Sequence, residues 1–110
     1  MTQASSPPVS SLRNLGPAMD EACARAGIHT ADQLRALGTD QAYAQLLRNG
    51  TRPHFIGYYV LEMALQGRPW NDCKGDEKKA LRKRFDALKD RAFDPKKSEF
   101  ERIMDQIGLR

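Results

Sequence analysis

The stretch GIHTADQLRALGTDQAYAQLL, residues 27–47, decides the fold class because it alternates helix signals with glycine stops. Thr30 is an N-cap residue before a helix over 31–37, which the next glycine ends. Thr39 then caps a second helix over 40–49, whose apolar residues recur at helical spacing. Two helices joined by a tight glycine turn form a helix-hairpin-helix-like element. Such elements grip nucleic-acid backbones in some proteins and only pack small helical domains in others.

Helix signals continue on both sides of this stretch. Pro17 stands at a first helical position, and Gly27 follows the end of the helix that begins there. Pro53 opens an apolar helix over 54–66 that has no polar face, so we expect it to be surrounded as the central element. A long amphipathic helix over 76–91 carries its apolar residues on a single stripe. The sequence therefore predicts an all-α protein, a compact bundle of about five short helices.

The length of 110 residues and a hydrophobic fraction of 40% suffice for one modest core. β-branched residues are scarce, and no segment predicts a strand. We expect a disordered leader over 1–10, a helical domain over 11–92 and a C-terminal extension over 93–110 that is helical over 98–109. Nothing in the sequence decides whether this last helix docks on the domain or on a partner. We expect Trp70, in the loop before the long helix, to fold over the core.

Several classes of protein and site are excluded. The N-terminus lacks both a basic start and an apolar run, and the most apolar segment is too short to cross a bilayer and contains Glu62, so we expect a soluble, cytoplasmic protein. Cys23 and Cys73 stand far apart without CxxC spacing, which argues against a disulfide. His29 and His54 show no paired ligand spacing with them, so we expect no metal site.

The sequence also contains no motif that indicates an enzyme. The chain has no GxSxG nucleophile elbow, no glycine-rich phosphate loop and no pair of carboxylates isolated in an apolar setting. We therefore expect a non-enzymatic protein, with no catalytic residue and no cofactor.

Positive charge is concentrated in one part of the chain. The net charge is +4 and the pI about 9.3, and residues 74–97 hold ten basic and five acidic side chains, a net charge of +5. Six basic residues of the long helix face away from its apolar stripe: Lys78, Lys79, Arg82, Lys83, Arg84 and Lys89. This distribution is typical of non-specific binding to a nucleic-acid backbone, and we expect Lys78, Lys79, Arg82 and Lys83 to contact phosphates.

The alternative to phosphate contact is a solvent-exposed helix whose charges form local ion pairs with one another, for example Asp76 with Lys79. No aromatic residue is interleaved with these cations, so base stacking is not expected. With so few charges, any DNA affinity should be weak and should fall steeply with salt.

The glycine turn is a second candidate contact. Gly38 permits close approach, Thr39 adds a hydroxyl, and the following amides lie at a helix N-terminus that suits a phosphate. Asp40 argues against phosphate binding because its carboxylate stands where the phosphate would bind. The alternative interpretation is that Thr39 and Asp40 only cap the helix. Arg52, in the loop before the apolar helix, either positions a phosphate or forms a polar corner.

A set of spaced residues resembles one known family. They are Leu12, Leu15, Gly16, Gly27, Ile28, Thr30, Leu34, Leu37, Gly38, Ala42, Tyr43, Leu65, Gly67 and Trp70. Their order and spacing over roughly residues 11–90 resemble the C-terminal domain of the TfoX/Sxy proteins, regulators of natural competence. The resemblance implies a helical domain with a helix-hairpin-helix-like element over 34–47.

In that family, full-length regulators carry an α/β domain before this one and act as coactivators of competence-gene transcription. We expect this sequence to depart from the pattern in two ways, with no such domain before residue 11 and with an additional predicted helix after residue 95.

Two functions follow as expectations. The first is a regulatory domain with weak, backbone-directed DNA contact in transcription or competence. The second is a protein-interaction module that engages the transcription machinery or another partner, through 98–109 or the exposed hairpin, without nucleic acid. A third, a small-molecule pocket between the helices over 54–66 and 76–91, has less support.

Overall fold

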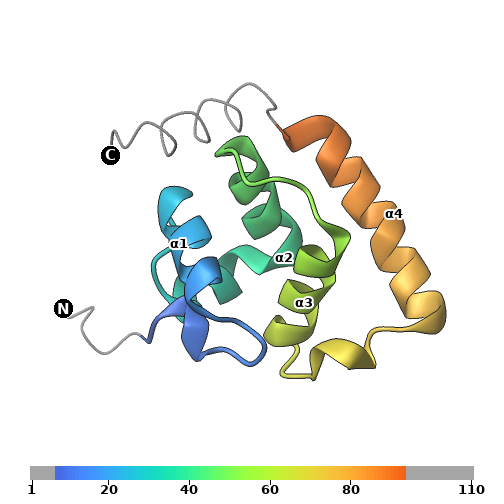
Figure 1. Cartoon of the computed structure of the whole chain (residues 1–110), viewed down its shortest axis with the longest axis horizontal. Coiled ribbons are helices and arrows are strands. Elements are labelled where there is room, and N and C mark those ends of the chain that lie inside the picture. The colour runs from blue at the N-terminus through green and yellow to red at the C-terminus, as the bar shows by residue number, and fades with distance from the viewer. Residues whose placement is uncertain (1–6, 94–110) are drawn as a thin grey trace.

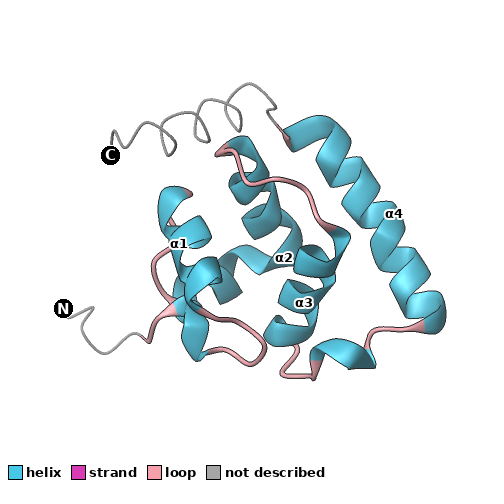
Figure 2. Ribbon diagram, viewed as in Figure 1, coloured by secondary structure: helices cyan, strands magenta, loops and turns pink. Residues whose placement is uncertain are grey.

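The computed structural model describes residues 7–93, and within them every regular element is helical. The elements are the 3₁₀ turn η2 (Val9–Ser11), α1 (Pro17–Arg25), α2 (Ala31–Arg48), α3 (Phe55–Leu65), the 3₁₀ turn η3 (Trp70–Asp72) and α4 (Gly75–Ala92). The all-α prediction is confirmed (Figure 2). The helix expected over 98–109 lies outside the described residues.

α2 is the central element of the bundle. It contacts η2, α1, α3 and α4, and Figure 1 shows α1 on one side of it and α4 running along the opposite side, past α3. The two helices predicted over 31–37 and 40–49 form this one bent element. Its bend is at Gly38, where φ is 79° and ψ is 168°, a conformation that is essentially confined to glycine. The Thr30 hydroxyl caps α2 as predicted, accepting a hydrogen bond from the backbone N–H of Gln33 at 3.0 Å.

The prediction that the apolar helix is surrounded was wrong. α3 buries Tyr58, Leu61 and Met63 against α2, α4 and η3, but these neighbours cover only part of its circumference. Ile56 on the uncovered side is 64% exposed. Within residues 7–93, no helix combines the length and the hydropathy needed to span a membrane.

The expected position of Trp70 was also wrong, because its side chain is 52% exposed. No residue of the turn η3 is buried, and Cys73, which follows the turn, is the core residue here at 4% exposed. The backbone N–H of Trp70 donates a hydrogen bond to Asn14 Oδ1 at 3.2 Å, so the turn is held by its main chain rather than by the indole ring.

The folded part of the described chain begins earlier than the leader predicted over 1–10 implies. Val9 is only 1% exposed, and the carbonyl of Pro7 accepts a hydrogen bond from the N–H of Ala31 at 2.9 Å. The N–H of Ser10 donates to Asp20 Oδ1 at 2.7 Å. Residues 7–10 thus close one end of the core, and residues 1–6 lie outside the described part.

Candidate nucleic-acid interface

α4 carries the basic side chains that the sequence predicts to contact phosphates. One stripe of the helix is buried, and it consists of Leu81, Phe85, Leu88 and Ala92. α4 packs this stripe against α2 and α3. The remaining positions of the helix therefore lie at its flanks or face solvent, and the cations among them differ in what they contact.

Arg84 is held by acidic groups of two other helices. Its Nη2 lies 2.8 Å from Asp40 Oδ1, its Nε lies 3.2 Å from Asp40 Oδ2, and its Nη2 lies 3.6 Å from Glu62 Oε1. The hydroxyl of the fully buried Tyr58 donates a hydrogen bond to the same Asp40 carboxylate. Arg84 therefore joins α4 to α2 and α3 and is not free to bind phosphate.

The pKa values of these groups reflect the network. Burial raises the pKa of Asp40, but hydrogen bonds from Arg84 and Tyr58, together with the charges of Arg84 and Arg91, outweigh burial and hold that pKa below its ordinary value. Burial, then the Asp40 carboxylate, raises the pKa of Tyr58 far above its ordinary value. At neutral pH, Asp40 is thus ionised and Tyr58 is a hydrogen-bond donor.

Arg82 lies over aromatic rings at the flank of α4. Its guanidinium carbon is 5.2 Å from the ring centre of Phe55 and 5.5 Å from that of Phe85, and its Nε lies 3.2 Å from Asp86 Oδ1. Lys89 also approaches both Phe85 and Asp86, at 5.7 Å and 3.9 Å. These contacts compensate part of the positive charge on this flank.

Lys78 continues the same flank, with its Nζ 4.9 Å from the ring centre of Tyr59. Aromatic rings therefore lie beneath the cations after all. Phe55 and Tyr59 belong to α3, and Phe85 belongs to the buried stripe of α4, so none of them appears among the exposed residues of α4. The cations cover the ring faces, so these rings do not form an open platform for base stacking.

Lys79 and Lys83 are the cations of α4 that remain available among the four predicted contacts. Both are exposed, they stand one helical turn apart, and neither has an ion-pair or hydrogen-bond partner within residues 7–93. The ion pair expected between Asp76 and Lys79 is not formed in this part of the chain. The structure thus leaves a pair of open lysines rather than a continuous cationic strip.

The glycine turn lies elsewhere on the surface. Thr39 is buried and only 6% exposed, and a groove of about 330 Å³ beside it is lined by Arg35, Gly38, Thr39, Glu62, Leu65 and Gln66. These residues belong to α2, to α3 and to the C-cap of α3, so the lysines of α4 do not contribute to the groove. The Glu62 carboxylate in its wall disfavours an anion.

Arg52 is exposed in the loop between α2 and α3 and has no ion-pair partner among the described residues. The loop itself is held by Tyr43, whose hydroxyl donates to the carbonyl of His54 and accepts from its N–H, both at 3.1 Å. The His54 side chain does not cap α3. Arg52 is therefore available to solvent but is not brought to Lys79 or Lys83 by any contact of the described chain.

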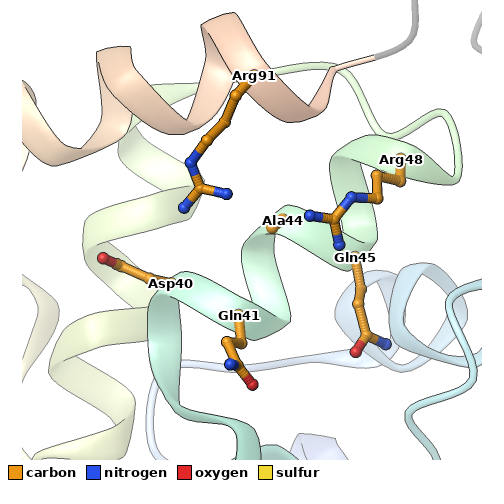
Figure 3. A pocket seen from close by; sticks show the side chains of 6 residues that line it. All are labelled: Asp40, Gln41, Ala44, Gln45, Arg48 and Arg91. Atoms are coloured by element: carbon orange, nitrogen blue, oxygen red, sulfur yellow. The ribbon is translucent and has the colours of Figure 1, made fainter.

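A second groove, between α2 and α4, contains two arginines that the sequence analysis did not select. Arg48 and Arg91 stand in the last turns of α2 and α4, where a cation is readily explained by the helix dipole alone. Only the packing of the two helices shows that both side chains line one groove (Figure 3).

The cysteines offer no reactive site. Cys23 is fully buried, and burial, followed by the charge of Asp20, raises the pKa of its thiol to about 11. Cys73 is 4% exposed, and burial raises the pKa of its thiol as well. Among residues 7–93, no three His, Cys, Asp or Glu side chains gather as metal ligands.

Comparison with known proteins agrees with the resemblance found in the sequence. The TfoX C-terminal domain family matches residues 6–85, which is most of the chain and nearly all of the described bundle. No curated protein and no solved structure is a significant match. The chain therefore belongs to the TfoX C-terminal domain family.

Proposed function

We propose that this protein is a non-enzymatic regulatory domain that contacts the phosphate backbone of duplex DNA through Lys79 and Lys83 of α4. The observation that carries the proposal is the exposure of these two lysines, one turn apart, with no acidic partner in the described chain. An unpaired ammonium group on the surface is free to replace a counterion at a phosphate, whereas a paired one must first leave its partner.

The arrangement favours weak binding without sequence preference. Phosphate contacts position a protein on DNA but do not read its bases. Arg82 and Arg84, which have the planar fork that recognises guanine, are engaged by Asp86 and Asp40. We therefore expect affinities in the range of non-specific complexes, about 10⁻⁴ to 10⁻⁶ M at physiological salt.

The regulatory part of the proposal is supported by family membership. TfoX/Sxy regulators act as coactivators of competence-gene transcription, and we propose a role of this kind, in transcription or competence, for this chain. We expect the protein in the cytoplasm, where such a regulator meets DNA.

A second candidate, binding of a protein partner without nucleic acid, is favoured by one observation. Ile56 and Trp70 expose 64% and 52% of their surfaces, although both are large apolar side chains. On this alternative, the basic surface of α4 would meet an acidic region of a component of the transcription machinery.

Titration of a fluorescent DNA duplex at low and moderate salt separates the two candidates. The test variant is K79E/K83E, and the matched control is R13E/R25E, which changes the charge equally at two exposed arginines without ion-pair partners in the described chain. We expect the test variant to lose binding at low salt and the control to retain most of it. Equal loss in both variants, or no binding by the native protein, overturns the DNA proposal and leaves the protein partner.

A further inference from the structure

The groove between α2 and α4 has the features of an anion site. It has a volume of about 380 Å³ and is lined by Asp40, Gln41, Ala44, Gln45, Arg48 and Arg91. Figure 3 shows the guanidinium groups of Arg48 and Arg91 pointing from opposite sides into the space at Ala44. Ala44 has only a methyl group, so the space between the two guanidinium groups is not filled by a side chain from below.

The charges of the groove do not balance. Its one acidic side chain, Asp40, is already engaged by Arg84 and by the hydroxyl of Tyr58. Neither Arg48 nor Arg91 has an ion-pair or hydrogen-bond partner within residues 7–93. The groove therefore holds two guanidinium groups and one carboxylate, whose charge acts on Arg84 as well as on Arg91, so positive charge is in excess among the described residues.

The amides of the groove differ in their availability. Gln45 Nε2 donates a hydrogen bond to the carbonyl of Ala26 at 3.0 Å, so this group is used in packing α2 against the end of α1. Gln41 is exposed and makes no hydrogen bond through its side chain within the described chain, so its amide N–H groups are free to donate to a ligand.

We infer that this groove binds a phosphate group, held between the guanidinium forks of Arg48 and Arg91. A guanidinium group donates two parallel hydrogen bonds to two oxygens of an anion. A carboxylate has two oxygens in one plane and is satisfied by a single fork, whereas the oxygens of a phosphate point in several directions and accept from two forks at once. Two arginines on opposite sides of one space therefore fit a phosphate best.

The helix dipole alone does not account for this geometry. It favours a cation in the last turn of each helix, but it does not require the two side chains to point into a shared space. The inference also goes beyond DNA contact by Lys79 and Lys83, because neither lysine lines the groove. The phosphate belongs either to a small compound or to a nucleic-acid backbone, and the two sources give different results in the experiment below.

The test is a titration of the ¹⁵N-labelled full chain with inorganic phosphate and with pyrophosphate, at constant ionic strength set with chloride. We expect amide shifts concentrated at Gln41, Ala44 and Gln45, and a dissociation constant that rises at least about tenfold in R48Q/R91Q. The matched control R13Q/R25Q removes the same charge outside the groove and should leave the phosphate affinity unchanged. Because Arg48 and Arg91 are exposed, the spectrum of R48Q/R91Q without phosphate should keep the dispersion of the native protein.

Shifts of equal size in both variants, or shifts spread over all exposed basic residues, overturn the inference. A parallel titration with duplex DNA identifies the source of the phosphate. If R48Q/R91Q weakens DNA binding along with phosphate binding, the groove holds a backbone phosphate; if it weakens phosphate binding alone, the ligand is a small phosphate compound. The inference survives the failure of the DNA proposal, since phosphate binding is measured without DNA.

Discussion

Arg84 of α4 and Asp40 of α2 form a two-point ion pair, with Nη2 at 2.8 Å from Oδ1 and Nε at 3.2 Å from Oδ2. The pair connects residues that are 44 positions apart in the sequence. It removes Arg84 from the basic surface of α4, and it turns the Asp40 carboxylate toward α4 and Tyr58. The ion pair is therefore part of the packing of the bundle and not of a DNA contact.

Removing the Asp40 carboxylate should destabilise the protein by more than a surface ion pair would. In D40A, the buried hydroxyl of Tyr58 loses its acceptor, so we expect a loss of about 1–3 kcal/mol in the free energy of unfolding. Urea denaturation of D40A, R84A and the double variant measures the coupling, which we expect to be at least about 0.5 kcal/mol. In a Y58F background, the effect of D40A should shrink. Additive effects and an unchanged D40A effect in Y58F would show that the network is not coupled.

The stability that depends on Asp40 should vanish in acid. Because its folded pKa lies below its unfolded value, the ionised carboxylate stabilises the protein above about pH 4, and this contribution is lost as the pH falls through the folded pKa. The difference in unfolding free energy between the native protein and D40N should therefore be full at pH 7 and narrow below about pH 4. A difference that stays constant from pH 7 to pH 2.5 is the opposite result.

The bend of α2 should tolerate no side chain at its centre. A Cβ at Gly38 would meet no atom within 4 Å, so the penalty for G38A is purely conformational, and we expect about 1–3 kcal/mol. Gly57 offers a matched control because it lies within α3, and a Cβ there would only touch the Tyr43 hydroxyl at 4.0 Å. G57A should stabilise the protein by up to about 1 kcal/mol. Thermal unfolding of both variants gives the comparison, and equal effects would argue against a strained bend.

Both cysteine thiols should resist alkylation in the native state. Burial raises the pKa of Cys23 to about 11 and also raises that of Cys73, so little thiolate is present at pH 8. Reaction with iodoacetamide, followed by mass spectrometry, should be slow for the folded protein and fast in denaturant. Rapid labelling of either residue in the folded protein would show that its burial is incomplete or transient.

Local signals predicted the helices well. The cap at Thr30 and the break at Gly38 depend on a few neighbouring residues. The structure shows the cap where the sequence indicates it, and it shows a bend within α2 at the glycine where the sequence indicates the end of a helix. The contacts of the cations depend instead on packing between helices. Neither the approach of Arg82 to Phe55 nor the pairing of Arg84 with Asp40 has a signal in the sequence of α4.

Residue type and local composition did not predict the burial of Val9 or the exposure of Trp70. Val9 stands in a segment of serine and proline that predicts disorder, yet it completes the core because Pro7 accepts a hydrogen bond from the first residue of α2. Trp70 is large and apolar, as core residues are, but it lies in a 3₁₀ turn and is exposed to solvent. In both cases, tertiary context overrides residue type.

The salt dependence of DNA binding tests the central proposal most directly. Each phosphate neutralised contributes about −0.9 to the slope of log K against log salt concentration. If Lys79 and Lys83 each contact a phosphate, the slope for K79Q/K83Q should be shallower by about 1.8 than the slope for the native protein, and that for R13Q/R25Q should be unchanged. An identical slope for the native protein and K79Q/K83Q would contradict the proposal that these lysines contact DNA.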